Sequence, residues 1–204
     1  MKCCIFLCVL ACLLQFTLSD KGLLDTPTHK VWMDIKIPHY RKRRCTFGLF
    51  GNKWPKTVEL FRALITGEKG NSTLGRPLSF KNHIFHQNED NYGAFIGNFT
   101  GEELIKISGT PDMNYTDEIG QYAHNRRYLL TRHTHSNNSD FEQFTITYNW
   151  LKMLDKTHTV FGEVLDGYDI IDMLEDEGAD FYPEGHFFQP CVARIDIVDW
   201  GMVE

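Results

Sequence analysis

The sequence carries little positive charge: 21 lysines and arginines stand against 27 aspartates and glutamates, which gives a net charge of −6 over 204 residues. General nucleic-acid binders usually show the opposite balance, so we expect no nucleic-acid partner. The sequence also lacks an apolar run of the ~20 residues that a membrane-spanning helix needs, so we expect no membrane anchor. No internal repeat, low-complexity tract or linker divides the chain. Its length and composition therefore predict one globular domain.

An apolar segment at the start of the chain predicts its destination. The run Cys3–Phe16 is interrupted by a single glutamine, and the small residues Thr17 and Ser19 follow at −3 and −1 relative to a cut after Ser19. This is the pattern of a secretory signal peptide. We predict a signal peptide at residues 1–19, an N-terminal extension at 20–28 and a folded domain at 29–202. The protein is then expected to be secreted or to reside in the lumen of the secretory pathway.

Few cysteines remain once such a leader is removed. Four of the six lie in residues 1–19, and only Cys45 and Cys191 follow. In an oxidising compartment this pair is a disulfide candidate. Two separate buried thiols fit the sequence equally well, so both alternatives stay open.

Four Asn-x-Ser/Thr sequons fit the same compartment and make the protein a candidate glycoprotein. The candidate N-glycosylation sites are Asn71, Asn98, Asn114 and Asn137. A glycan on Asn98 would obstruct peptide entry if that residue lies beside a binding groove, whereas an unmodified Asn98 would be a simple replacement for aspartate in a strand.

Alternating apolar residues predict strands at Val31–Ile37 and Cys45–Phe50, joined as a hairpin. A helix is predicted from Pro55, with Gly67 as its stop. The remaining expected elements are strands at Phe80–His86, Ala94–Phe99, Tyr128–Thr131, Gln143–Tyr148, Thr159–Leu165 and Ala193–Ile197, and a second helix at Tyr168–Glu175. Many short strands with two distant helices are typical of a closed antiparallel barrel capped by helices.

Three stretches of the sequence resemble the cyclophilin family in order and spacing. The first is Phe47–Gly51 followed by Pro55–Leu64 and Thr66–Gly70, the second is Gln143–Thr147, and the third is Leu154–Gly167. The resemblance implies a mainly β fold, a closed eight-stranded antiparallel β-barrel capped by two α-helices. It also implies a groove on the outer barrel face that takes Xaa-Pro peptides.

The resemblance further implies a peptidyl-prolyl cis-trans isomerase, an enzyme that assists protein folding. Amide resonance sets a barrier of ~20 kcal/mol to rotation about the Xaa-Pro bond, and an enzyme lowers it by binding the twisted amide best. Cyclophilins use an arginine near the prolyl nitrogen, and a glutamine and an asparagine that bind the peptide backbone. They need no cofactor and no metal.

The catalytic motif departs from the family pattern. The family's Phe-His-Arg is here Phe85-His86-Gln87, so a neutral amide replaces the arginine. Loss of one preorganised donor of this kind costs ~3 kcal/mol of transition-state stabilisation, about a hundredfold in rate. Gln87, in the place of the arginine, and His158, which matches the family, are the candidate catalytic residues.

The peptide-binding residues depart as well. Phe95 replaces the backbone-binding glutamine, Thr134 the asparagine, Thr145 an aromatic residue and Met153 a tryptophan. The full set of candidate substrate-binding residues is Tyr92, Phe95, His133, Thr134, Gln143, Thr145, Met153 and Leu154.

Two hypotheses follow. The first is a catalytically weak or inactive monomer that binds peptide or protein clients, including Xaa-Pro segments, and that binds cyclosporin weakly. The alternative is a functional isomerase for proteins of the secretory pathway. An arginine from elsewhere, such as Arg126 or Arg132, placed over the position of Gln87 would favour the alternative. A metal site built on His133 and His135 with His124 and His158 nearby is a weaker interpretation, because no cysteine or carboxylate completes the ligand set.

Overall fold

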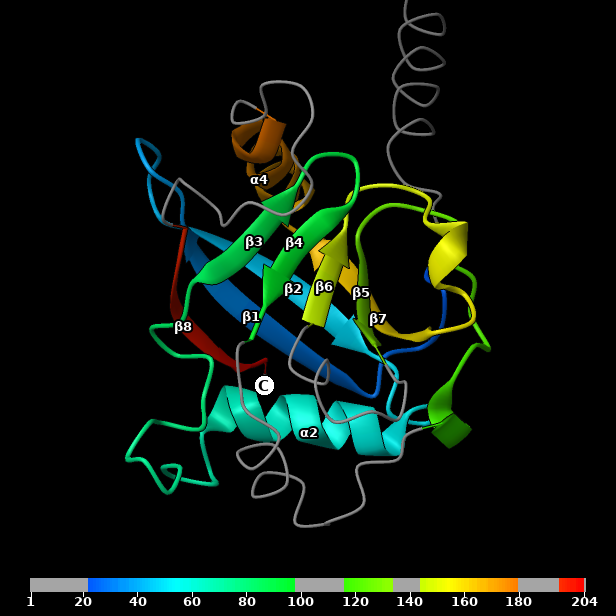
Figure 1. The fold of residues 1–204 in the computed structure, drawn as a ribbon, viewed down its shortest axis with the longest axis horizontal. Helices are drawn as coiled ribbons and strands as arrows, with labels where there is room; N and C mark the ends of the chain where they lie inside the picture. The colour runs from blue at the N-terminus through cyan, green and yellow to red at the C-terminus, as the bar shows by residue number, and fades with distance from the viewer. Residues whose placement is uncertain (1–21, 98–115, 134–143, 180–194, 204) are drawn as a thin grey trace, which may run out of the picture.

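The computed structural model describes residues 22–97, 116–133, 144–179 and 195–203. These residues form a mainly β fold of eight strands, two α-helices and two short 3-10 helices (Figure 1). The strands are β1 (His29–Lys36), β2 (Arg43–Leu49), β3 (Phe85–Glu89), β4 (Gly93–Ile96), β5 (Leu129–His133), β6 (Phe144–Thr147), β7 (His158–Asp166) and β8 (Asp196–Met202). The helices are α2 (Pro55–Thr66), η1 (Thr116–Glu118), η2 (Lys152–Leu154) and α4 (Tyr168–Ala179).

The strands form one antiparallel sheet in the order β3-β4-β6-β5-β7-β2-β1-β8. The predicted hairpin of β1 and β2 is confirmed, with Met33 opposite Cys45. Both residues are wholly buried, which explains why the alternation of apolar residues in these strands was so clear. The prediction of an eight-stranded antiparallel sheet with two helices is confirmed.

The sheet curls until its two edges approach each other. His83–Phe85 and Ile195–Ile197 exchange backbone hydrogen bonds: Phe85 donates to the Ile195 carbonyl at 3.0 Å, and Ile197 donates to the His83 carbonyl at 2.8 Å. Ile84 and Asp196 form an isolated antiparallel bridge at the same place. Strands β3 and β8 form no longer ladder among the described residues, so complete closure of the barrel stays a prediction.

The two helices lie at opposite ends of the curled sheet, α2 below and α4 above in Figure 1. Pro55 stands at the first turn of α2, where its fixed φ suits a helix start, and Gly67 ends the helix with φ of 68°. Both ends of this helix therefore agree with the prediction.

Phe61 of α2 anchors the helix to the core. Its ring contacts those of Phe80, Phe144, Phe161 and Trp200, with centroid separations of 5.2, 4.8, 5.1 and 5.6 Å. Most of these contacts are edge-to-face, the arrangement that aromatic quadrupoles favour. One helical residue thus joins side chains of β6, β7 and β8 into a single core.

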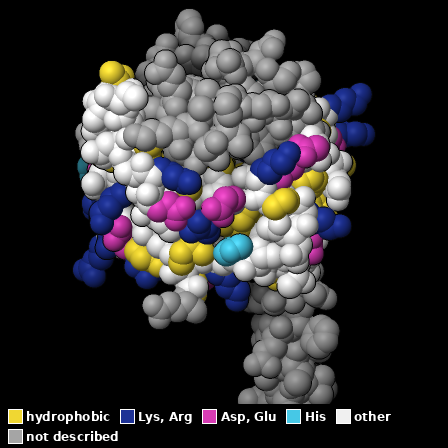
Figure 2. Space-filling view, turned by 90° about the horizontal axis from the view of Figure 1, so that it is seen from below, with side chains coloured by type: hydrophobic (Ala, Val, Ile, Leu, Met, Phe, Trp, Pro, Cys, Tyr) yellow, Lys and Arg dark blue, Asp and Glu magenta, His cyan; other side chains and the backbone are white. Residues whose placement is uncertain are grey.

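The outer face of α2 is charged. Arg62 pairs with Glu59 at 2.7 Å and with Glu68 at 3.1 Å, and Lys56 pairs with Asp117 at 2.6 Å. Figure 2, which views the molecule from this end, shows basic and acidic side chains beside one another. Among the described residues no helix is both long enough and apolar enough to cross a membrane.

Two predicted strands are displaced. The strand expected at Phe80–His86 begins only at Phe85, because the chain turns at Asn82, where φ is 62°. Phe80 precedes this turn and packs into the core, where its ring stacks on that of Trp200. Its apolar side chain therefore does not indicate a strand. The last strand, expected to end at Ile197, runs on to Met202 along β1.

Candidate functional site

Three of the predicted catalytic and binding residues, Gln87, Phe95 and Thr145, share one face of the sheet. Gln87 lies opposite Phe95, Phe95 opposite Thr145, and Thr145 opposite Thr131, which makes a row across β3, β4, β6 and β5. We call these four residues the outer row. The residues that alternate with them, including Ala94, point into the core, so the outer row faces away from it.

Gln87, the first residue of the outer row, is hydrogen-bonded to an acidic side chain. The Gln87 side chain donates a hydrogen bond from Nε2 to Oε1 of Glu89, two residues along the same strand. Burial raises the pKa of Glu89 above its ordinary value, and the hydrogen bond from Gln87 opposes that rise. The position of the family's arginine is therefore occupied by a neutral group whose amide is engaged with a carboxyl.

Two aromatic rings lie beside this contact. Tyr92 stacks on Phe95, with centroids 5.5 Å apart and planes 14° from parallel. The His86 ring lies 6.4 Å from Phe95. Both ring nitrogens of His86 are buried and have no hydrogen-bond partner among the described residues, and burial lowers the pKa of this histidine. The rings of Tyr92, Phe95 and His86 therefore form a largely apolar surface next to Gln87.

Histidines occupy the other end of the site. His133 on β5 lies opposite His158 on β7, with ring centroids 4.8 Å apart, and the ring of His124 lies 6.2 Å from that of His158. Burial, reinforced by His133 and His124, lowers the pKa of His158 to about 3. His158 is therefore neutral near pH 7, and its Nδ1 lies 2.9 Å from Oγ1 of Thr157.

His124 has a structural environment of its own. Its Nδ1 lies 2.9 Å from Oδ1 of Asp155, and its Nε2 lies 2.9 Å from Oγ1 of Thr131 in the outer row. The backbone amide of His124 donates to the same Asp155 oxygen at 2.7 Å. Within the described parts of the chain, no group of three or more histidine, cysteine or acidic residues is arranged to hold a metal ion.

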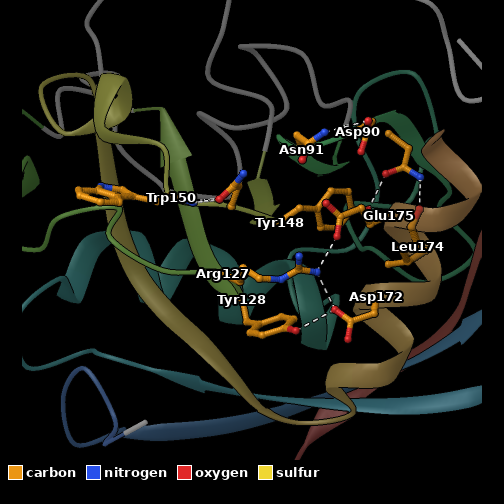
Figure 3. Close-up of polar contacts among 11 residues, drawn as sticks. Asp90, Asn91, Arg127, Tyr128, Tyr148, Trp150, Asp172, Leu174 and Glu175 are labelled. Carbon is orange, nitrogen blue, oxygen red and sulfur yellow. Dashed lines mark hydrogen bonds and ion pairs between the residues drawn. The ribbon is translucent and has the colours of Figure 1, made fainter.

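The two predicted substrate-binding residues in η2 differ in exposure. Leu154 is 5% exposed and Met153 is 68% exposed. Trp150, just before η2, is also largely exposed, and its side chain points away from the other labelled residues in Figure 3. Leu154 is thus buried, whereas Met153 reaches solvent at the position where the resemblance places a tryptophan.

The arginines named as possible substitutes for the missing cation lie elsewhere. Arg132 is wholly buried and lies opposite Phe144, on the core side of the sheet and not in the outer row. Arg126 donates to the carbonyl of Gly22 at 2.9 Å and lies 3.8 Å from Glu163.

Arg127, the neighbour of Arg126, is held by α4. Its guanidinium donates to Asp172 at 2.7 Å and to Glu175 at 2.5 Å, and the Tyr128 hydroxyl donates to Asp172 at 2.8 Å (Figure 3). These contacts fasten the chain before β5 to α4.

Glu89 and His86 were not among the predicted site residues. The signal for Glu89 was present in the sequence, because in a strand the residue two beyond Gln87 must share its face. The burial of the two His86 nitrogens carried no such signal, since it depends on a bulge between Phe85 and Gln87.

Several predictions lie outside the described residues. These are the signal peptide, the substrate-binding residues Thr134 and Gln143, the disulfide partner Cys191 and the sequons at Asn98, Asn114 and Asn137. The remaining sequon residue, Asn71, lies within the described residues and is exposed. The other disulfide candidate, Cys45, is buried, and its thiol donates to the carbonyl of Asp166 at 3.2 Å. Burial raises the pKa of the Cys45 thiol.

Comparison with known proteins gives two findings. Residues 33–197 match the family model described as cyclophilin type peptidyl-prolyl cis-trans isomerase/CLD. The chain is also 36% identical, over 155 residues, to a protein of Rhizopus delemar named peptidyl-prolyl cis-trans isomerase cyp11. That match covers 74% of this chain and 45% of the fungal protein, so the chain spans less than half of its relative's length.

Proposed function

Because this chain belongs to the cyclophilin-type peptidyl-prolyl cis-trans isomerase family, we propose that it is a binding module for proline-containing protein segments. In this proposal it accelerates rotation about the Xaa-Pro bond weakly or not at all. The clients are peptides or proteins, and the protein acts as a monomer. It is secreted or works in the lumen of the secretory pathway, as the apolar leader at residues 1–19 and the exposed sequon at Asn71 suggest.

The contact between Gln87 and Glu89 carries the proposal. In the twisted amide the prolyl nitrogen gains lone-pair density, which a nearby cation stabilises. Gln87 brings no charge, and its amide already donates to Glu89. A carboxylate near that nitrogen would oppose the gain in electron density, so the outer row is suited to hold a peptide and poorly suited to twist it.

The rest of the outer row supports binding without strong catalysis. Phe95 offers a ring where the family has a backbone-binding glutamine, and it forms with Tyr92 a stacked apolar surface. His158 is neutral near pH 7 and so supplies no charge in place of the arginine. Cyclosporin is expected to bind weakly, because Met153 is exposed at the place of a pocket tryptophan.

A protease-coupled assay of a short Xaa-Pro peptide tests the proposal. We expect the wild-type rate to be indistinguishable from the uncatalysed rate, and Gln87→Arg to raise it by restoring the cation. The matched control is Gln121→Arg, which adds the same charge at an exposed glutamine outside the outer row. Rapid turnover by the wild type would instead support the alternative, a folding catalyst in which Gln87 and His158 retain a role.

A further inference from the structure

Glu89 is an acid on the proposed peptide-binding face, and no cation in the described part of the chain balances its charge. Its side chain is half-buried on β3 and shares the face of Gln87. Oε1 accepts the Gln87 amide, and none of the lysines and arginines in the described residues pairs with this carboxyl. A half-buried carboxylate pays a desolvation cost that a bound cation would offset.

The turn between β3 and β4 brings an aromatic surface to this acid. The backbone amide of Tyr92 donates to the carbonyl of Glu89 at 3.1 Å, and Asn91 has φ of 57°, a value that asparagine tolerates well. Because the turn is tight, the Tyr92 ring lies next to Glu89 and stacks on Phe95. Both burial and the charge of Glu89 raise the pKa of Tyr92, which is consistent with their closeness.

The same two groups, a carboxylate and an electron-rich ring, attract cations by different means. A carboxylate forms charge-assisted hydrogen bonds with ammonium or guanidinium groups. A tyrosine or phenylalanine face attracts a cation within about 6 Å of its centroid. The described neighbours of Glu89 on this turn add a second acid, the exposed Asp90, and no basic residue.

We propose that Glu89, Tyr92 and Phe95 form a subsite for a cationic side chain, the ammonium of a lysine or the guanidinium of an arginine that neighbours the proline of the bound peptide. The inference rests on the proposed function, because it names the class of peptide that the same face selects. Gln87 positions the acid by donating to Oε1, and no hydrogen bond to Oε2 is found among the described residues, so Oε2 is available to accept one from the cation. The protein's net charge of −6 favours approach of the same basic peptides.

Fluorescence anisotropy with three labelled peptides tests this subsite. The peptides share one length and a central Ala-Pro, and carry lysine, glutamine or glutamate on both sides of it. For the wild type we expect the lysine peptide to bind about tenfold more tightly than the glutamine peptide, and the glutamate peptide to bind most weakly. Glu89→Gln should reduce the ratio of lysine to glutamine affinities to near one.

The matched control is Asp90→Asn, which removes the same charge from an exposed side chain one residue further along. It should keep most of the lysine preference, since Asp90 is exposed in the turn after β3 and its carboxyl accepts a hydrogen bond from Asn91 at 2.9 Å. Equal binding of all three peptides by the wild type, or an unchanged preference in Glu89→Gln, would overturn the inference while leaving the proposed function standing. Failure of every peptide to bind would refute the proposed function, and the subsite with it.

Discussion

At position 87 a neutral amide replaces a cation, and the next side chain on that face of the strand is the acid Glu89. In the proposed function these two residues act in the same direction. Gln87 supplies no positive charge to stabilise a twisted prolyl amide, and Glu89 places a carboxyl group beside it. The motif Phe85-His86-Gln87 predicts Gln87 as a site residue. Glu89 is not predicted, because it lies outside the motifs that carry the family resemblance.

His158 illustrates a residue whose identity could be predicted and whose charge could not. The sequence places it at a family position, but its protonation depends on burial and on two other histidines brought together by the fold. His133 lies opposite His158 on the adjacent strand, although the two residues are 25 positions apart in the sequence. The folded sheet therefore keeps His158 neutral below the ordinary pKa near 6.5, where a histidine of the unfolded chain would be charged.

A pH prediction follows from that neutral state. The folded pKa of His158 is about 3, below the ordinary value near 6.5, so the unfolded chain binds more protons than the folded chain between these two values. Stability must then fall as the pH decreases through this window. His158→Gln removes one such group, so its melting temperature should fall by several degrees less than that of the wild type between about pH 7 and pH 5.

Thermal unfolding followed by circular dichroism gives the melting temperature of each protein at both pH values. The quantity compared is the loss of melting temperature between the two pH values, so a pH-independent effect of the substitution on stability cancels. His29→Gln, on β1 and outside the histidine cluster, is the control and should keep the wild-type loss. His86 and His124 also have lowered pKa values, so part of the pH dependence will remain in His158→Gln. An identical loss in His158→Gln and wild type would contradict the account.

At the scale of elements, helix α2 depends on a residue far away in the sequence. Trp54, the N-cap residue just before the helix, makes no capping hydrogen bond with its side chain. Instead Glu118 of η1 accepts hydrogen bonds from the backbone amides of Lys56 at 2.8 Å and Thr57 at 2.9 Å, and from the Thr57 hydroxyl at 2.6 Å. A carboxylate at this end satisfies unpaired amides and interacts favourably with the helix dipole.

Replacing this acid should weaken the fold measurably. Glu118→Gln loses the charge on three hydrogen bonds in a buried place, so we expect the free energy of unfolding to fall by about 1–2 kcal/mol in urea denaturation. Asp117→Asn is the matched control, because Asp117 makes an ion pair with Lys56 that is exposed to solvent on both sides and should contribute far less to stability than the buried contacts of Glu118. If the two variants lose equal stability, Glu118 does not act as the cap of α2.

The elements that local chemistry determines were predicted well. Pro55 and Gly67 delimit α2, and the hairpin of β1 and β2 follows from its alternation. The elements that tertiary contacts determine were not. The turn at Asn82 exists because its amide donates to the carbonyl of Ile197 at 3.1 Å, a partner at the opposite end of the chain.

The candidate site divides in the same way. Sequence motifs identified the outer-row residues Gln87, Phe95 and Thr145, and the structure brings these three together. The capping role of Glu118 and the carboxyl contact of His124 join residues from different elements and could not be predicted, since a single sequence records no contacts.

At the scale of the whole molecule, one curled sheet holds the outer row in fixed register while α2 and α4 cover its two ends. Residues just before β1 contact the folded domain, and Leu24 packs against its hydrophobic core. Leu24 donates its amide to Glu163 of β7 at 2.7 Å, and Tyr122 donates its hydroxyl to Asp25. The extension that the sequence placed before the domain is thus fastened to it, beside the strand that carries His158.

The central claim is that this barrel binds a prolyl peptide without easing its isomerisation, and exchange NMR tests both halves in one sample. A peptide with one Ala-Pro bond is titrated with the protein while cis–trans exchange is followed. We predict peptide shifts that move on binding, with no exchange between cis and trans signals within about a second, since the uncatalysed reaction takes tens to hundreds of seconds. Strong exchange signals at catalytic amounts of the wild-type protein would contradict the account.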